Sequence, residues 1–216
     1  MQTAAAFAIA VLLLAVPAAA QQPVPPDAAG IWGFAYEDQA GQPPAAVAER
    51  NAISCLAEPS LIAPAAEGYV LNAYRIDLVS FTAGTARYLL QFENLCNYDA
   101  TSGLESCRRI GDPTDDAVYW TWYEPLDAAA GIYRAHFFSD DAELAAFKAK
   151  KTLPSVRFVT FRCPAEQQPR RQLLQAATRD ENQSQASYDR MLENFQSCGY
   201  PLCGAEVQRL HDLVSD

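Results

Sequence analysis

Residue types that often perform chemistry in proteins are sparse in this sequence. It has no Gly-rich phosphate loop, no H-E-x-x-H pair and no G-x-S-x-G nucleophile motif. Neither His136 nor His211 has a second histidine at ligand spacing, so a zinc site would need Cys198 and Cys203 beside His211. We expect disulfides to consume these cysteines. We therefore predict no metal and no cofactor, and no motif identifies a catalytic residue.

One polar cluster is a candidate pocket. Its members come from two neighbouring segments and are Asn94, Tyr98, Glu105 and Arg109. A four-residue loop at 100–103 places Cys96 opposite Cys107 and puts all four polar residues on the same face of a hairpin. If that face is interior, Glu105 and Arg109 must pair, because unpaired buried charge is costly. The alternative, which we favour, is that this end of the hairpin reaches solvent.

Cysteine usage predicts three disulfides. The chain has six cysteines, which allow fifteen pairings. The hairpin register pairs Cys96 with Cys107, since directly opposed Cβ atoms lie within disulfide reach. Cys198 and Cys203 bracket a turn that contains Gly199 and Pro201. The remaining pair, Cys55 and Cys163, would close a loop of about a hundred residues, worth roughly 4–5 kcal/mol in the chain-entropy model.

The first twenty residues are typical of a secretory signal peptide. An apolar run from Ala4 to Val16 precedes Pro17 and three alanines. The run is shorter than the ~20 residues of a membrane span and lacks basic flanks. We predict cleavage after residue 20, a Pro-rich leader at 21–29 and no membrane span thereafter. The protein is then exported to the periplasm or the extracellular space, which agrees with paired cysteines.

Composition narrows the class of protein. The formal net charge is −10, and the acidic residues are spread along the chain. Such a protein repels nucleic acid and anionic membranes, so no nucleic-acid partner is expected. Hydrophobic residues make up 50% of the chain, which excludes a wholly disordered protein.

The stretch from Tyr69 to Ile110 predicts a meander of three antiparallel strands. Alternation puts Tyr88, Leu90 and Phe92 on one face. A three-residue loop at 83–85 would place the apolar residues of the preceding strand on that same face, and these are Tyr74, Ile76 and Leu78.

Further strands are predicted on both sides of this meander. They span Ile31–Glu37, Asn51–Leu56, Ala117–Glu124, Ile132–Phe138 and Val156–Cys163. We expect a loop or short helix at 41–50, irregular chain at 58–68, and a helix that starts at Ser139 or Asp140 and ends before Pro154. Seven or eight strands with short connections predict a mainly β domain over residues 30–163, an antiparallel barrel or sandwich.

Residues 164–216 are predicted to be helical. Glu166–Ser187 reads as a helix with few apolar anchors: Leu173, Leu174 and Ala177. An amphipathic stripe follows at Tyr188, Met191, Leu192 and Phe195, and a second at Val207, Leu210, His211 and Val214. Two helices stapled at Cys198 and Cys203 would form a hairpin. The first stripe either docks on the β domain, which we favour, or binds a protein partner or a second copy.

Gly30 and Trp32 form a Gly-x-Trp at the opening strand of an exported protein, ahead of an antiparallel meander. This arrangement resembles lipocalin-like barrels and implies a barrel with an apolar cavity. The alternative is that Trp32 is a core residue. For Trp120 and Trp122, the choice is between a ligand-binding wall and a strand covered by a helix, and we favour the covered strand.

The functional hypotheses follow from these features. The first is an exported, non-catalytic protein that holds a small, partly apolar ligand in a barrel lined by Trp32, Tyr98, Trp120 and Trp122. The second is an envelope or secreted interaction protein that acts through its C-terminal helices. The third is an enzyme without a recognisable motif.

Overall fold

A closed β-barrel forms most of the computed structural model, which describes residues 28–35, 41–42, 44–111, 117–179 and 185–215. Eight of the strands within these residues form its wall: β1 (Gly30–Ala35), β2 (Ser60–Pro64), β3 (Tyr69–Ile76), β4 (Tyr88–Asp99), β5 (Leu104–Arg109), β6 (Val118–Asp127), β7 (Ile132–Phe138) and β8 (Val156–Arg162). The predicted signal peptide and residues 21–27 of the predicted leader lie outside the described residues.

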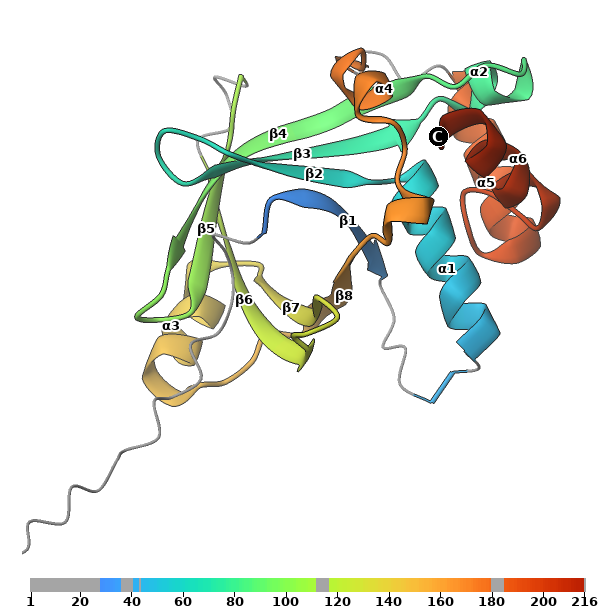
Figure 1. The fold of residues 1–216 in the computed structure, drawn as a ribbon. Helices are drawn as coiled ribbons and strands as arrows, with labels where there is room; N and C mark the ends of the chain where they lie inside the picture. The colour runs from blue at the N-terminus through green and yellow to red at the C-terminus, as the bar shows by residue number, and fades with distance from the viewer. Residues whose placement is uncertain (1–27, 36–40, 43, 112–116, 180–184, 216) are drawn as a thin grey trace, which may run out of the picture.

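The barrel closes because each strand pairs antiparallel with the next along the chain and β8 returns to β1 (Figure 1). A closed ring leaves no long unpaired sheet edge. The short strand β9 (Thr178–Arg179) adds to β4 in parallel. The predicted mainly β, antiparallel fold is confirmed, and the barrel is the correct one of the two predicted architectures.

The β4–β5 hairpin has the predicted register. Cys96 lies opposite Cys107, Tyr98 opposite Glu105 and Asn94 opposite Arg109. Four residues, 100–103, connect the strands, and Gly103 has a positive φ of 72° that suits the turn.

The β3–β4 connection differs from the prediction. Helix α2 (Leu78–Thr82) replaces the end of the expected strand, because the side chain of Asp77 accepts a hydrogen bond from the backbone nitrogen of Val79 and caps the helix. Tyr74 therefore pairs with Leu90 and Ile76 with Tyr88. The expected three-residue loop is wrong. Its odd length nevertheless gave the correct face, since eleven residues now separate Ile76 from Tyr88.

The predicted strand at Asn51–Leu56 is also wrong. These residues belong to helix α1 (Pro44–Ala57), whose many alanines favour a helix. Ser54 on this helix accepts a hydrogen bond from the backbone nitrogen of Phe34, over 2.7 Å. Glu58–Gly68, expected to be irregular, contains β2 instead. Its prolines stand just before the strand and at its last residue, where they remove no interior hydrogen bond.

Helix α3 (Asp141–Lys150) lies between β7 and β8, as predicted. Asp140 caps it by accepting a hydrogen bond from the backbone nitrogen of Glu143, and the Glu143 side chain accepts one from Ser139. Both hydrogen bonds satisfy backbone donors at the start of the helix.

The C-terminal segment is more broken than predicted. In place of one helix over Glu166–Ser187 there are a short 3-10 turn (Ala165–Gln167), helix α4 (Arg171–Gln175) and β9. Pro169 interrupts the chain between the first two, since proline cannot donate a backbone hydrogen bond. Helices α5 (Gln185–Cys198) and α6 (Ala205–Val214) form the predicted hairpin.

The largest apolar core lies where the helices cover the barrel wall. Ile53 and Leu56 of α1 and Leu210 and Val214 of α6 pack there with residues of the strands, and all four are buried. Figure 1 shows α1, α2, α5 and α6 gathered on one side of the barrel, while α3 lies at the opposite side. The helices thus cover part of the barrel and leave its interior to be lined by the strands.

The structure contains disulfides with the same pairing that the sequence predicts: Cys55–Cys163, Cys96–Cys107 and Cys198–Cys203. The first was expected to join two strands. It joins helix α1 to the end of β8 and so fixes the helical layer to the barrel.

Candidate ligand-binding cavity

The barrel encloses a cavity of about 690 Å³, within the range of about 300–1,000 Å³ typical of small-molecule sites. Aromatic side chains dominate its wall: Trp32, Phe34, Tyr69, Tyr74, Phe92, Tyr119, Tyr123, Tyr133, Phe137 and Phe158. Ile62 and Leu71 are the large aliphatic residues among the lining. Strand alternation explains the pattern on β6, where Tyr119, Thr121 and Tyr123 face inward.

A buried carboxylate, Glu105 on β5, is the central polar group of this cavity. Glu105 is only 3% exposed to solvent. Tyr69 on β3 donates a hydrogen bond to Oε2, and Tyr123 on β6 donates one to Oε1 over 2.9 Å. Phenols from two different strands therefore hold the carboxylate and satisfy part of its hydrogen-bonding capacity.

The surroundings of Glu105 shift its titration. Burial raises the pKa of its carboxyl from 4.5 to about 7, and the hydrogen bond from Tyr123 opposes that rise. Burial and the neighbouring carboxylate raise the pKa of Tyr123 well above its ordinary 10.0. The phenol of Tyr123 therefore remains a donor at neutral pH, while Glu105 changes charge there.

Asn94 and Arg109 face each other on β4 and β5, with the Cys96–Cys107 pair between them and Glu105 along the hairpin. Both line the cavity, and the Arg109 guanidinium lies over the ring of Phe92, 5.3 Å from its centroid. In the part of the chain that the structure describes, Oδ1 of Asn94 is buried without a hydrogen-bond partner. Such an atom is a specific place at which a ligand could donate.

Glu58 and Arg75 form a second charged region of the lining. Burial raises the pKa of Glu58, and the positive charge of Arg75 opposes that rise. Arg75 extends toward helix α5, where its Nη1 lies 3.7 Å from the sulfur of Met191.

The cavity reaches the surface at the turn between β6 and β7. The exposed alanines 128–130 line it there, together with Gly131 and Arg162. Gly131 has a φ of +71°, and a Cβ at this position would lie 3.0 Å from that of Arg162, so glycine is required. The Arg162 guanidinium lies over the ring of Trp32, 5.1 Å from the centroid.

The predicted ligand-binding residues do not all meet in this cavity. Trp32 lines it, and its ring nitrogen donates a 2.7 Å hydrogen bond to the backbone oxygen of Ala28. Tyr98 packs beside the Cys96–Cys107 disulfide and is not part of the lining. Ligand binding by Trp32 and Tyr98 stays a prediction.

Trp120 and Trp122, the other two predicted ligand-binding residues, do not line the cavity. They occupy the outer face of β6 and pack beneath α3, where the ring of Trp122 lies 5.5 Å from that of Phe147. The covered-strand interpretation is therefore the one that the structure supports.

Three of the four residues in the predicted polar cluster line the cavity on β4 and β5, and Tyr98 is the exception. Asn94, Glu105 and Arg109 face the barrel interior. The interpretation that we favoured, in which this end of the hairpin reaches solvent, is therefore wrong for these three residues. Glu105 is held by tyrosines and not by the Arg109 pairing that an interior position was expected to need. Strand alternation places Tyr123 on the same face of β6 as Tyr119, but no signal in the sequence joins Tyr123 to Glu105.

Within the described part of the chain, Cys96, Glu105 and Cys107 form a group of potential metal ligands, and Glu105 and Cys107 line the cavity. The two sulfurs are bonded to each other, and a disulfide sulfur is not the thiolate that binds metal. Cys198 and Cys203 are likewise joined. Neither group of cysteines is therefore available as a metal site.

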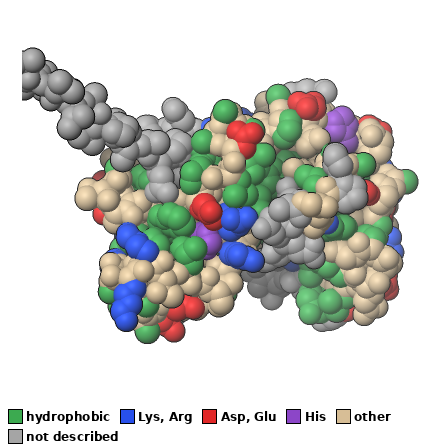
Figure 2. All heavy atoms as spheres, turned by 90° about the horizontal axis from the view of Figure 1, so that it is seen from below, with side chains coloured by type: hydrophobic (Ala, Val, Ile, Leu, Met, Phe, Trp, Pro, Cys, Tyr) green, Lys and Arg blue, Asp and Glu red, His purple; other side chains and the backbone are tan. Residues whose placement is uncertain are grey.

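The outer surface carries a second candidate feature, the stripe on α5. Tyr188, Leu192 and Phe195 are 41%, 39% and 43% exposed, whereas Met191 packs against the main core. Acidic and basic side chains are interspersed on the face shown in Figure 2, so no large area of one charge appears there.

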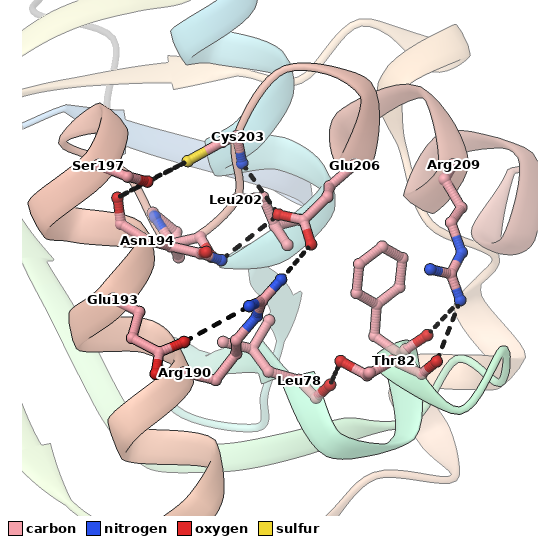
Figure 3. Close-up of polar contacts among 12 residues, drawn as sticks. Leu78, Thr82, Arg190, Glu193, Asn194, Ser197, Leu202, Cys203, Glu206 and Arg209 are labelled. Atoms are coloured by element: carbon pink, nitrogen blue, oxygen red, sulfur yellow. Dashed lines mark hydrogen bonds and ion pairs between the residues drawn. The ribbon is translucent and has the colours of Figure 1, made fainter.

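Polar contacts attach the α5–α6 hairpin. Figure 3 shows Arg190 between Glu193 and Glu206, and Arg209 reaching the backbone of α2. Nη2 of Arg209 donates to the Phe81 oxygen over 2.8 Å. The helices are thus held by hydrogen bonds as well as by the buried residues of α6.

None of the described helices combines the length and the apolar character needed to cross a bilayer. Comparison with known proteins finds no matching family model, no matching curated protein and no matching solved structure. The closed barrel is consistent with the resemblance to lipocalin-like proteins, but it shows the architecture alone.

Proposed function

We propose that this protein is exported and non-catalytic, and that it binds a small, partly apolar molecule inside its barrel. The observation that carries the proposal is the cavity of about 690 Å³, in which aromatic walls surround a few convergent polar groups. Such a combination is typical of sites that bind small molecules.

The polar groups of the cavity suit binding better than catalysis. Glu105 is held by two phenols, and the raised pKa of Tyr123 makes it a hydrogen-bond donor and not a nucleophile at neutral pH. The three disulfides support an oxidising location, and the predicted signal peptide favours the periplasm or the extracellular space.

The proposal can be tested by thermal denaturation with a panel of small apolar and amphipathic compounds. A compound at one hundred times its Kd should raise the midpoint by roughly 5–10 °C. Thr121→Phe, which fills the cavity from β6, should abolish that shift. Trp122→Phe, on the outer face of the same strand, is the matched control and should retain it. No shift with any compound, or a shift that survives Thr121→Phe, contradicts the proposal.

A second candidate function is self-association through the α5 stripe, because three large side chains there are exposed. Leu192→Ser should lower the native mass at high protein concentration if two copies bury this stripe. A mass that is already monomeric at every concentration removes this candidate.

A further inference from the structure

The composition of the cavity wall indicates the class of ligand. Ten of the lining residues are aromatic, and the large aliphatic ones are Ile62 and Leu71. Flat rings pack edge-to-face or offset against other rings, and such pairs gain free energy beyond the burial of their area. The wall therefore favours a planar aromatic ligand.

The buried acceptors indicate which polar group that ligand carries. A carboxylate offers about four acceptor positions, and the structure shows one phenol donating to each oxygen of Glu105. Acceptor positions therefore remain on a group that cannot donate when ionised. The buried Oδ1 of Asn94, also in the lining, is a second acceptor. A matching ligand must donate hydrogen bonds.

The charges around the cavity narrow the ligand further. Arg75, Arg109 and Arg162 line it together with the acids Glu58 and Glu105. Three guanidinium groups oppose a cationic ligand, and Glu105 opposes an anionic group at its own position. A neutral donor, such as a hydroxyl on a ring, satisfies both conditions.

On this basis, and resting on the proposed function, we propose that the barrel selects neutral aromatic alcohols or phenols. The ring lies among the aromatic side chains of the wall. Glu105 accepts the hydrogen bond of the ligand hydroxyl and is the residue that determines specificity.

Three probes test the proposal by calorimetric titration of the full chain: 2-naphthol, 2-methylnaphthalene, which keeps the ring but replaces the hydroxyl, and 1-decanol, which keeps the hydroxyl but replaces the ring. We expect 2-naphthol to bind at least about tenfold more tightly than either above pH 7, where Glu105 is ionised, because hydrogen bonds to a charged acceptor are stronger than those to a neutral one. This comparison needs no variant.

Variants then assign the effect to Glu105. In Glu105→Gln, the preference for 2-naphthol over 2-methylnaphthalene should fall severalfold, because the acceptor loses its charge. Glu193→Gln, which removes a carboxylate from the exposed surface of α5, should leave the preference unchanged.

The outcomes separate this inference from the proposed function. Tighter binding of 1-decanol overturns the aromatic class but leaves ligand binding in the barrel intact. Equal affinity for the two naphthalenes, or an unchanged preference in Glu105→Gln, overturns the role of Glu105. Absence of binding by all three probes overturns this ligand class, and only a negative result with the whole compound panel overturns the proposed function as well.

Discussion

Replacement of Glu105 by glutamine should change how the stability of this protein depends on pH. The carboxyl has a pKa of about 7 in the folded protein and an ordinary value of 4.5 when unfolded. Between these values the folded state holds a proton that the unfolded state has released, so rising pH destabilises the folded state. A difference of about 2.5 pKa units, at 1.36 kcal/mol each, corresponds to about 3 kcal/mol.

Glutamine resembles the protonated acid in shape and hydrogen bonding but does not titrate. The free energy of unfolding of Glu105→Gln should therefore gain about 3 kcal/mol relative to the wild type between pH 4 and pH 8. The comparison cancels the contributions of other titrating groups, which both proteins share.

Urea denaturation, followed by tryptophan fluorescence with the disulfides intact, measures this difference at each pH. Glu193→Gln is the control, because it removes one carboxylate from a side chain that is 67% exposed. A difference between Glu105→Gln and wild type that stays constant from pH 4 to pH 8 would refute the reasoning. It would mean that burial does not raise the pKa of Glu105.

Other predictions concern the scaffold. Removal of the Cys55–Cys163 disulfide by a double alanine substitution should lower the free energy of unfolding by about 5 kcal/mol, because the bond spans 108 residues; urea denaturation measures it. Asp77→Ala should lower the free energy of unfolding by about 1–2 kcal/mol in the same assay, because it removes the cap of α2. Burial would raise the pKa of Asp77, but hydrogen bonds from Ser80, Arg87 and Val79 hold it below 3.8, so this contribution is present above that pH and lost in stronger acid. Leu210→Ala should lower the free energy of unfolding by about 2–5 kcal/mol, because Leu210 is fully buried; thermal denaturation measures the loss. A loss no larger than that of a surface substitution would contradict a docked hairpin.

The parts of the fold that the sequence predicted correctly depend on local geometry. The β4–β5 register follows from a four-residue loop and the positions of Cys96 and Cys107, and no distant residue is needed to find it. Once that pair and Cys198–Cys203 were assigned, the third disulfide followed by elimination. This is why Cys55–Cys163 was correct although the element that carries Cys55 was not.

The errors occurred where distant contacts decide the structure. β2 is short, follows one proline and ends on another, and it is a strand because β1 and β3 pair with it on both sides. The segment around Cys55 has a short apolar run that fits either a strand or a helix. Its covering position over β1, where Ser54 bonds the backbone of Phe34, is visible only in three dimensions.

The candidate site was harder to predict because the interior of this barrel reverses the usual relation between polarity and burial. Polar residues on one face of a strand normally indicate solvent, so Glu105 was expected to lie outside. On β6 the more apolar side chains, Trp120 and Trp122, face outward under α3, and the amphipathic Tyr119 and Tyr123 face the interior. The Tyr123 hydroxyl can bond to the buried Glu105 on the interior face, whereas contact with a covering helix needs no hydroxyl group. When both faces of a barrel strand are aromatic and a helix is predicted to cover one of them, the face with phenols is therefore the better candidate for the interior.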